Sequence, residues 1–135
     1  MQLTKNFTLE EMVRSNTAVS QGIDNIPEEE QVENLKKLCT RLLQPLRDIV
    51  QMPFNINSGF RCPFLNKAVG GVPTSQHTKG QAADVRVANP RGLLTELLKS
   101  DLDFDQAILY PTFLHLSYNS GHNRKQVLYA KGVQP

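Results

Sequence analysis

The chain has 135 residues, with 15 basic and 13 acidic side chains and a formal net charge of +2. This length predicts one domain spanning residues 1–135, which can bury about two thirds of its unfolded surface without cross-links. The balanced charge argues against nucleic acid as a partner. Cys39 and Cys62 are too few for a disulfide framework, so we expect two free thiols in a reducing compartment.

The beginning of the chain, MQLTKNFTLEEMVRS, has no apolar core of the kind found in secretory signals. No later window has the ~18 apolar residues of a transmembrane segment. We therefore expect a protein that is cytoplasmic as synthesised and that could act outside the membrane only after release. Nothing in the sequence indicates an oligomeric state.

The first predicted element is a short helix. Thr8 and Glu11 have the spacing of a capping box, which predicts a helix over about residues 9–15. Residues 16–26 are expected to form a loop.

A long core helix is expected to begin near Pro27, a residue suited to a first helical turn. Apolar side chains then recur at spacings of three and four, which is typical of one buried helical face: Val32, Leu35, Leu38, Leu42, Leu46 and Ile49. Pro45 removes a hydrogen-bond donor inside this pattern and crowds the carbonyl of Arg41. We therefore expect a kink or irregular turn near residues 41–44.

The middle of the chain alternates short elements. Residues 54–57 alternate apolar and polar side chains, as in a strand, and residues 63–69 resemble a two-turn helix ended by two glycines. Residues 71–79 are predicted to be an ordered loop. Alternation over 83–87 predicts a strand that presents Asp84 on the face opposite its apolar residues.

The last third predicts one helix and a hairpin. Asn89 can cap a helix over residues 90–99. Strands are expected over 104–110 and 113–118, joined by a tight antiparallel connection, with 126–130 as an edge strand. The whole pattern predicts an α+β fold, with a small antiparallel sheet and helices packed mainly on one face.

Two histidines and one aspartate predict a metal site in a cleft on this sheet. His77 and Asp84 are separated by six residues, too many for one helical face, so a turn at Lys79 and Gly80 must bring them together. His115 is expected on the strand over 113–118. Two imidazoles and a carboxylate can hold Zn²⁺ in tetrahedral geometry and leave a fourth position for water, as in catalytic zinc sites.

The same residues also have an ordinary structural interpretation. In it His77 caps a loop, Asp84 forms an ion pair with Arg86, and His115 is a hydrogen-bonded strand residue. The residue chemistry alone leaves both interpretations open.

A family resemblance favours the metal site. The segments SGFRCPFLNKAVGG, SQHTKGQAADV, FDQ and FLHLSY resemble the zinc D-alanyl-D-alanine carboxypeptidase family of peptidoglycan peptidases. Within that family, the chain is most similar to the short, single-domain, phage-associated branch. The resemblance covers most of the chain.

The resemblance implies a set of site residues. His77, Asp84 and His115 correspond to the zinc ligands, and Arg61 to the arginine that holds the substrate through paired hydrogen bonds to an oxygen group. Ser75 corresponds to a serine near the substrate. A structural loop arginine and an ordinary turn hydroxyl are the alternatives for the last two.

One family element is missing. The family usually has an acidic general base three positions before the last histidine, where this chain has Thr112, and a hydroxyl cannot take up a proton at neutral pH as a carboxylate can. Either another group takes this role, with Asp105, Tyr110 and His122 the nearest candidates by sequence, or a zinc-bound hydroxide acts without a strong base. Tyr110 could instead hydrogen-bond the substrate or fill the core.

The resemblance implies two possible functions. The first is zinc-dependent hydrolysis of a peptide bond in bacterial peptidoglycan, adjacent to D-alanine, as a carboxypeptidase or endopeptidase. The second is a zinc-bearing module that binds cell-wall peptide without catalysis, suggested by Thr112. A metal-free domain with structural histidines is a third interpretation.

Overall fold

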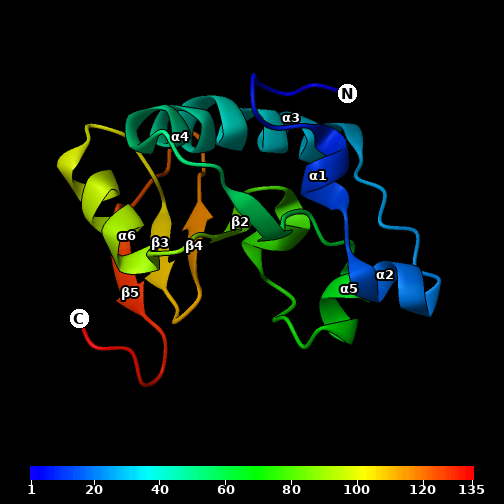
Figure 1. Ribbon diagram of the computed structural model, residues 1–135. Coiled ribbons are helices and arrows are strands. Elements are labelled where there is room, and N and C mark those ends of the chain that lie inside the picture. The colour runs from blue at the N-terminus through cyan, green and yellow to red at the C-terminus, as the bar shows by residue number, and fades with distance from the viewer.

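The computed structural model describes residues 1–135. It has a five-stranded sheet with helices packed against it (Figure 1). The helical elements are α1 (Leu9–Val13), α2 (Asn16–Gln21), α3 (Glu29–Leu38), the π-helix η1 (Cys39–Leu43), α4 (Gln44–Val50), α5 (Pro63–Ala68), the 3₁₀-helix η2 (Gln76–Lys79) and α6 (Pro90–Lys99). The strands are β1 (Asn55–Ser58), β2 (Ala82–Arg86), β3 (Gln106–Leu109), β4 (Phe113–Ser117) and β5 (Gln126–Tyr129).

The strand order is β1-β2-β4-β3-β5, and every neighbouring pair is antiparallel except β3 and β5. The predicted α+β fold is confirmed, and β5 is an edge strand as expected. The expectation of a wholly antiparallel sheet was wrong at β5. The chain turns back after β4, so β5 runs opposite to β4; because β4 is itself antiparallel to β3, β5 lies parallel to β3.

The core helix is interrupted where the proline predicted it. α3 ends at Leu38, and the π-helix η1 carries the chain to α4, with the Gln44 N–H donating to the Cys39 carbonyl. In a π-helix the hydrogen bonds join residues five apart instead of four. Pro45, which has no N–H to donate, therefore fits in the first turn of α4 while the helical segment continues. Cys39 lies buried in η1, and both cysteines are free thiols, as expected.

The segment predicted as a loop over residues 16–26 contains the helix α2, so that prediction was wrong for its first half. The Ser15 hydroxyl accepts a hydrogen bond from the Ala18 N–H at 3.1 Å and caps the helix. Gly22, at φ +66°, ends it in the left-handed conformation. The serine N-cap and the C-terminal glycine stabilise the two ends of α2, although its apolar pattern is weak.

The core lies between the helices and one face of the sheet. Leu35, Leu42 and Leu46 on the long helical layer are buried together with inward-facing strand residues such as Val85 and Leu114. The helices therefore cover mainly one face, as predicted, and Asp84 and His115 lie on the other. None of the helices has the length and apolar character needed to cross a bilayer.

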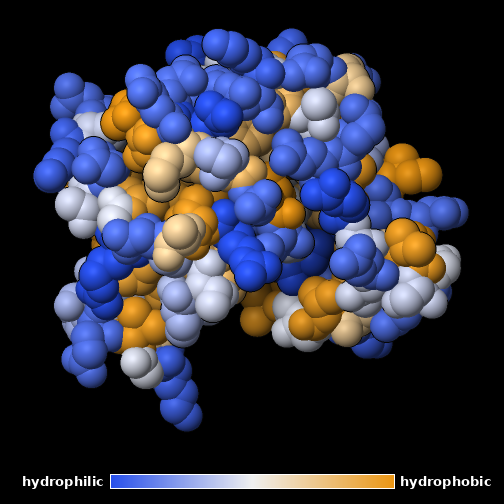
Figure 2. All heavy atoms as spheres, viewed as in Figure 1, coloured by the Kyte–Doolittle hydropathy of each residue, from blue (hydrophilic) through white to orange (hydrophobic).

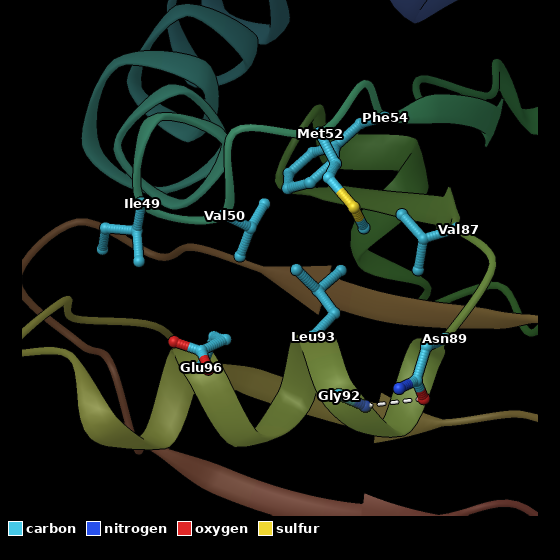
Figure 3. Close-up of a pocket in the computed structure, with 9 residues that line it drawn as sticks. All are labelled: Ile49, Val50, Met52, Phe54, Val87, Asn89, Gly92, Leu93 and Glu96. Atoms are coloured by element: carbon cyan, nitrogen blue, oxygen red, sulfur yellow. Dashed lines mark hydrogen bonds between the residues drawn. The ribbon is translucent and has the colours of Figure 1, made fainter.

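The surface is mostly hydrophilic, with scattered apolar side chains (Figure 2). Several of these lie around α2 and α5, where Val19 and Phe64 are 82% and 80% exposed. A separate apolar hollow of about 390 Å³ lies between α4 and α6, and its walls include Val50, Phe54 and Leu93 (Figure 3). It contains none of the predicted site residues.

Candidate metal centre

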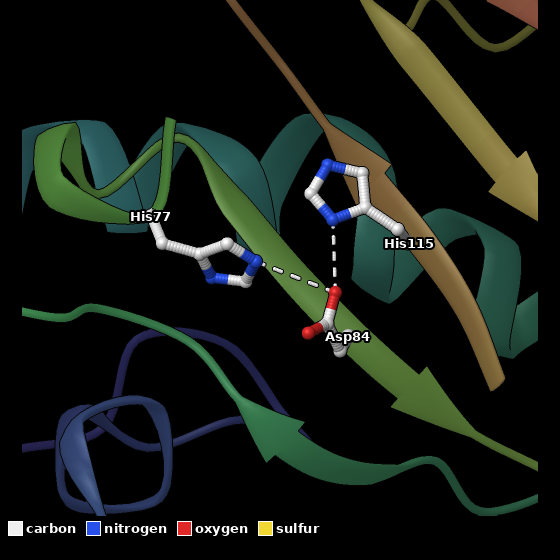
Figure 4. A group of neighbouring side chains, drawn as sticks. All are labelled: His77, Asp84 and His115. Atoms are coloured by element: carbon white, nitrogen blue, oxygen red, sulfur yellow. Dashed lines mark hydrogen bonds and ion pairs between the residues drawn. The ribbon is translucent and has the colours of Figure 1, made fainter. Parts of the chain in front are cut away.

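Three elements bring the predicted ligands together. His77 lies on η2, Asp84 on β2 and His115 on β4, and Asp84 and His115 are directly paired across the antiparallel strands (Figure 4). One donor atom from each residue lies within 4.8 Å of the other two. Zinc binds nitrogen and oxygen ligands at about 2.0–2.2 Å, so donors within this span can share one ion after small side-chain rotations.

The turn that joins His77 to Asp84 depends on Gly80. This residue has φ +73° and ends η2, and a Cβ atom there would lie 2.5 Å from the carbonyl oxygen of Gln31. Both the left-handed backbone and the close approach of α3 require glycine. The predicted turn at Lys79 and Gly80 is confirmed.

The orientation of His77 is set by a backbone carbonyl. Its Nδ1 lies 2.7 Å from the carbonyl oxygen of Gly59, which can only accept, so Nδ1 carries the proton and Nε2 has the free lone pair. His77 is only 2% exposed, so this hydrogen bond also holds the ring in place. A histidine ligand whose second nitrogen donates to a carbonyl is the usual arrangement in metal sites.

The ligand atoms of the three side chains lie so close together that a cation must separate them. Nε2 of His77 and Nδ1 of His115 lie 3.3 and 2.8 Å from the same oxygen, Oδ1 of Asp84. A lone pair on Nε2 and a carboxylate oxygen are both acceptors, so a metal ion or a proton must lie between them. With protons in that position, burial raises the pKa of Asp84, but the hydrogen bonds and charge of the two protonated imidazoles outweigh burial and hold that pKa well below its usual range.

The structural interpretation of these residues holds only in part, since His115 is a hydrogen-bonded strand residue, with its Nδ1 2.8 Å from Oδ1 of Asp84. Asp84 contacts both imidazoles and makes no ion pair with Arg86, which is exposed. Ser75, and not His77, caps this part of the chain: it is the N-cap of η2, and its hydroxyl accepts a hydrogen bond from the His77 N–H at 3.2 Å. The donor set of two imidazoles and a carboxylate fits zinc.

Comparison with known proteins agrees with this geometry. A family model described as Peptidase M15 matches residues 5–117. The chain belongs to the Peptidase M15 family. No curated protein matches it. M15 peptidases are zinc-dependent metallopeptidases that act on peptidoglycan peptides, which is the chemistry that the His77, Asp84 and His115 group fits.

Arg61 lies beside this M15 metal centre. Its backbone N–H donates to the His77 carbonyl at 3.0 Å, which ties it to the turn that carries the ligand. Burial lowers the pKa of its guanidinium, and the nearby charges of Asp84 and Tyr110 oppose that effect. Its Nε is buried without a hydrogen-bond partner. A half-buried arginine with an unused donor is suited to gripping an oxygen group of a ligand.

The other predicted residues are distributed around the sheet. Ser75 lines a hollow of about 600 Å³ together with His115, Asp105 and His122. Tyr110 stacks on Phe113 with ring centroids 4.3 Å apart.

Thr112 lies in the turn between β3 and β4. It lines a different hollow, shared with Asn55 and Arg86, and not the one that His115 lines.

Asp105 is held by several donors. Oδ1 accepts from the Arg124 backbone N–H and Nε at 3.0 and 2.8 Å, and Oδ2 accepts from Gln76 Nε2 and Arg124 Nη2 at 2.9 and 3.0 Å. Asp105 is 1% exposed. Such a carboxylate suits a structural role better than proton transfer. Sequence reasoning missed Arg124 and Gln76 as its partners, because no spacing rule joins these three positions.

Proposed function

We propose that this M15 peptidase hydrolyses a peptide bond in bacterial peptidoglycan adjacent to D-alanine, as a carboxypeptidase or endopeptidase. The proposal includes membership of the short, phage-associated branch and action on the cell wall after release from the cytoplasm. The observation that carries it is the convergence of His77, Asp84 and His115, with the Gly59 carbonyl keeping Nε2 of His77 free for a metal.

Each residue has a role in this proposal. His77, Asp84 and His115 would hold the zinc ion, which when bound supplies a Lewis acid for the peptide carbonyl. Arg61 grips an oxygen group of the peptide and keeps the scissile bond beside the metal, which lowers the entropic part of the barrier. Ser75 holds η2 through the His77 N–H and borders the hollow where the peptide lies.

We assign to His122 the role of general base, the group that accepts a proton during hydrolysis. It lines the same hollow as His115, is exposed, and makes no ion pair. A neutral imidazole nitrogen can take up a proton, which suits general acid–base catalysis. Thr112 faces another hollow, and both oxygens of Asp105 are already engaged.

The test is incubation of zinc-loaded protein with intact wall peptides, followed by mass spectrometry of the products. We expect one cleaved bond beside D-alanine and one zinc ion per chain. His77→Ala should lose both the bound zinc and the cleavage. Absence of stoichiometric metal, together with no products after zinc is added, would contradict the proposal.

A zinc-bearing binding module is the second candidate. Two observations favour it: Thr112 replaces the usual acid, and Asp105 is not free to act as a base. It predicts that zinc-loaded protein binds wall peptides in calorimetry and releases no product over long incubation. Zinc-dependent turnover would exclude it.

A further inference from the structure

The hollow beside His115 has an unusually polar lining. Its volume is about 600 Å³, within the range of ligand sites, and Val72 is its only apolar lining residue. The ionisable side chains around it are Lys79, Asp105, His115, His122 and Arg124. Arg61 does not line it, so the hollow is a region separate from the arginine assigned to substrate binding.

Asp105 is the only acid that lines this hollow, and its negative charge is neutralised by Arg124. Asp105 is 1% exposed and receives two hydrogen bonds from the guanidinium of Arg124 and one from Gln76. The negative charge of Asp105 is therefore paired with Arg124 and is not available to a ligand in the hollow.

The two basic side chains keep donors available. The Arg124 side chain is 56% exposed and uses Nε and Nη2 on Asp105, while its Nη1 makes no hydrogen bond within the chain. Lys79 is exposed and its ammonium group has no acidic partner. The charge that the hollow offers to a ligand is therefore positive.

We propose that this hollow is a subsite for a carboxylate-bearing residue of the substrate peptide, next to the scissile bond. Lys79 supplies a positive charge, and Nη1 of Arg124 supplies a hydrogen-bond donor held in place by Asp105. A carboxylate gains from both groups, whereas a carboxamide of the same shape keeps only weaker, neutral hydrogen bonds. This subsite rests on the proposed peptidase function.

The experiment compares two wall peptides that differ only at the residue next to the cleaved bond, with a free carboxylate in one and a carboxamide in the other. We expect kcat/KM of the wild-type protein to be about tenfold higher for the carboxylate. The ratio should fall as salt is added, because an exposed ion pair is screened.

Lys79→Gln should reduce the ratio to about threefold, and Lys79→Glu should reverse the preference. Lys37→Gln is the matched control, since Lys37 is exposed on α3 and does not line the hollow. Zinc content and circular dichroism of each variant show that the fold and metal centre are intact.

The possible outcomes distinguish failure of the subsite from failure of the peptidase function. Equal cleavage of both peptides by the wild-type protein, or an unchanged ratio in the Lys79 variants, overturns the subsite and leaves the peptidase function standing. If zinc-loaded protein cleaves neither peptide, the peptidase function fails and the subsite falls with it.

Discussion

At the scale of single residues, Gly59 links the fold to the metal centre. A Cβ atom at this position would collide with the carbonyl oxygen of Met12 in α1, while the Gly59 carbonyl accepts the hydrogen bond from His77 Nδ1. Any movement that relieves the collision also moves the group that orients a metal ligand.

We therefore expect Gly59→Ala to lower the free energy of unfolding by about 2 kcal/mol, as overpacking does. It should also weaken zinc binding by about tenfold, as loss of a ligand's hydrogen-bond partner does. Urea denaturation and competition with a chelator measure the two effects. Gly132→Ala is the control, because it strains a left-handed residue in open space and should leave zinc affinity unchanged.

His122 gives a second prediction for a single residue. His122→Ala should lower kcat by about 100-fold, because it removes the proton acceptor, with little change in zinc content. Steady-state kinetics measure kcat, and metal analysis measures the zinc content. His115→Ala should differ by losing the metal as well. A normal kcat in His122→Ala would assign proton transfer to another group.

At the scale of elements, Asp105 joins three segments that are distant in sequence. Its backbone N–H donates to the Ser117 carbonyl on β4, and its side chain binds Gln76 on η2 and Arg124 before β5. The carboxylate thus connects the turn that carries His77 with the loop that carries His122.

Asp105→Asn should lower the free energy of unfolding by about 2 kcal/mol at pH 7, since buried hydrogen bonds to a charged group are lost. Hydrogen bonds from Arg124 hold the pKa of Asp105 below its ordinary value. The stabilisation in the wild-type protein is therefore complete above the ordinary pKa of about 4 and disappears as the pH falls through the lowered one. Urea denaturation at pH 7 and pH 3 measures it. Asp103→Asn, at an exposed residue that accepts only from Asn123, should change little.

Element boundaries were predictable where one local signal was decisive. The Thr8 cap, Pro45 and the Asn89 cap each marked a helix end or a break that the structure has. α2 was missed because its apolar pattern is weak, although Ser15 and Gly22 enclose it. The parallel pairing of β5 could not be predicted, because it depends on β5 lying beside β3 and not beside β4, which precedes it in the chain.

At the scale of the whole molecule, the metal centre was predictable because its ligands lie in a distinctive motif with a glycine turn between two of them. The Asp105, Gln76 and Arg124 network was not predictable, because Arg124 lies 19 residues from Asp105 and Gln76 lies 29 residues away. Only the folded chain shows that Asp105 is buried in the wall of the hollow. The core itself has 22 buried residues and includes none of the three ligands.

Zinc removal should therefore weaken the protein without unfolding it. A ligand that binds only the folded state at 100 times its Kd contributes about 2.7 kcal/mol, which for a domain of this size raises Tm by about 10 °C. We expect chelator-treated protein to keep its circular dichroism spectrum at 25 °C and to gain about this shift when zinc is restored. His77→Ala should fold and show no zinc-dependent shift. Unfolding of the metal-free wild-type chain would mean that the ion, and not the hydrophobic core, holds the sheet to its helices.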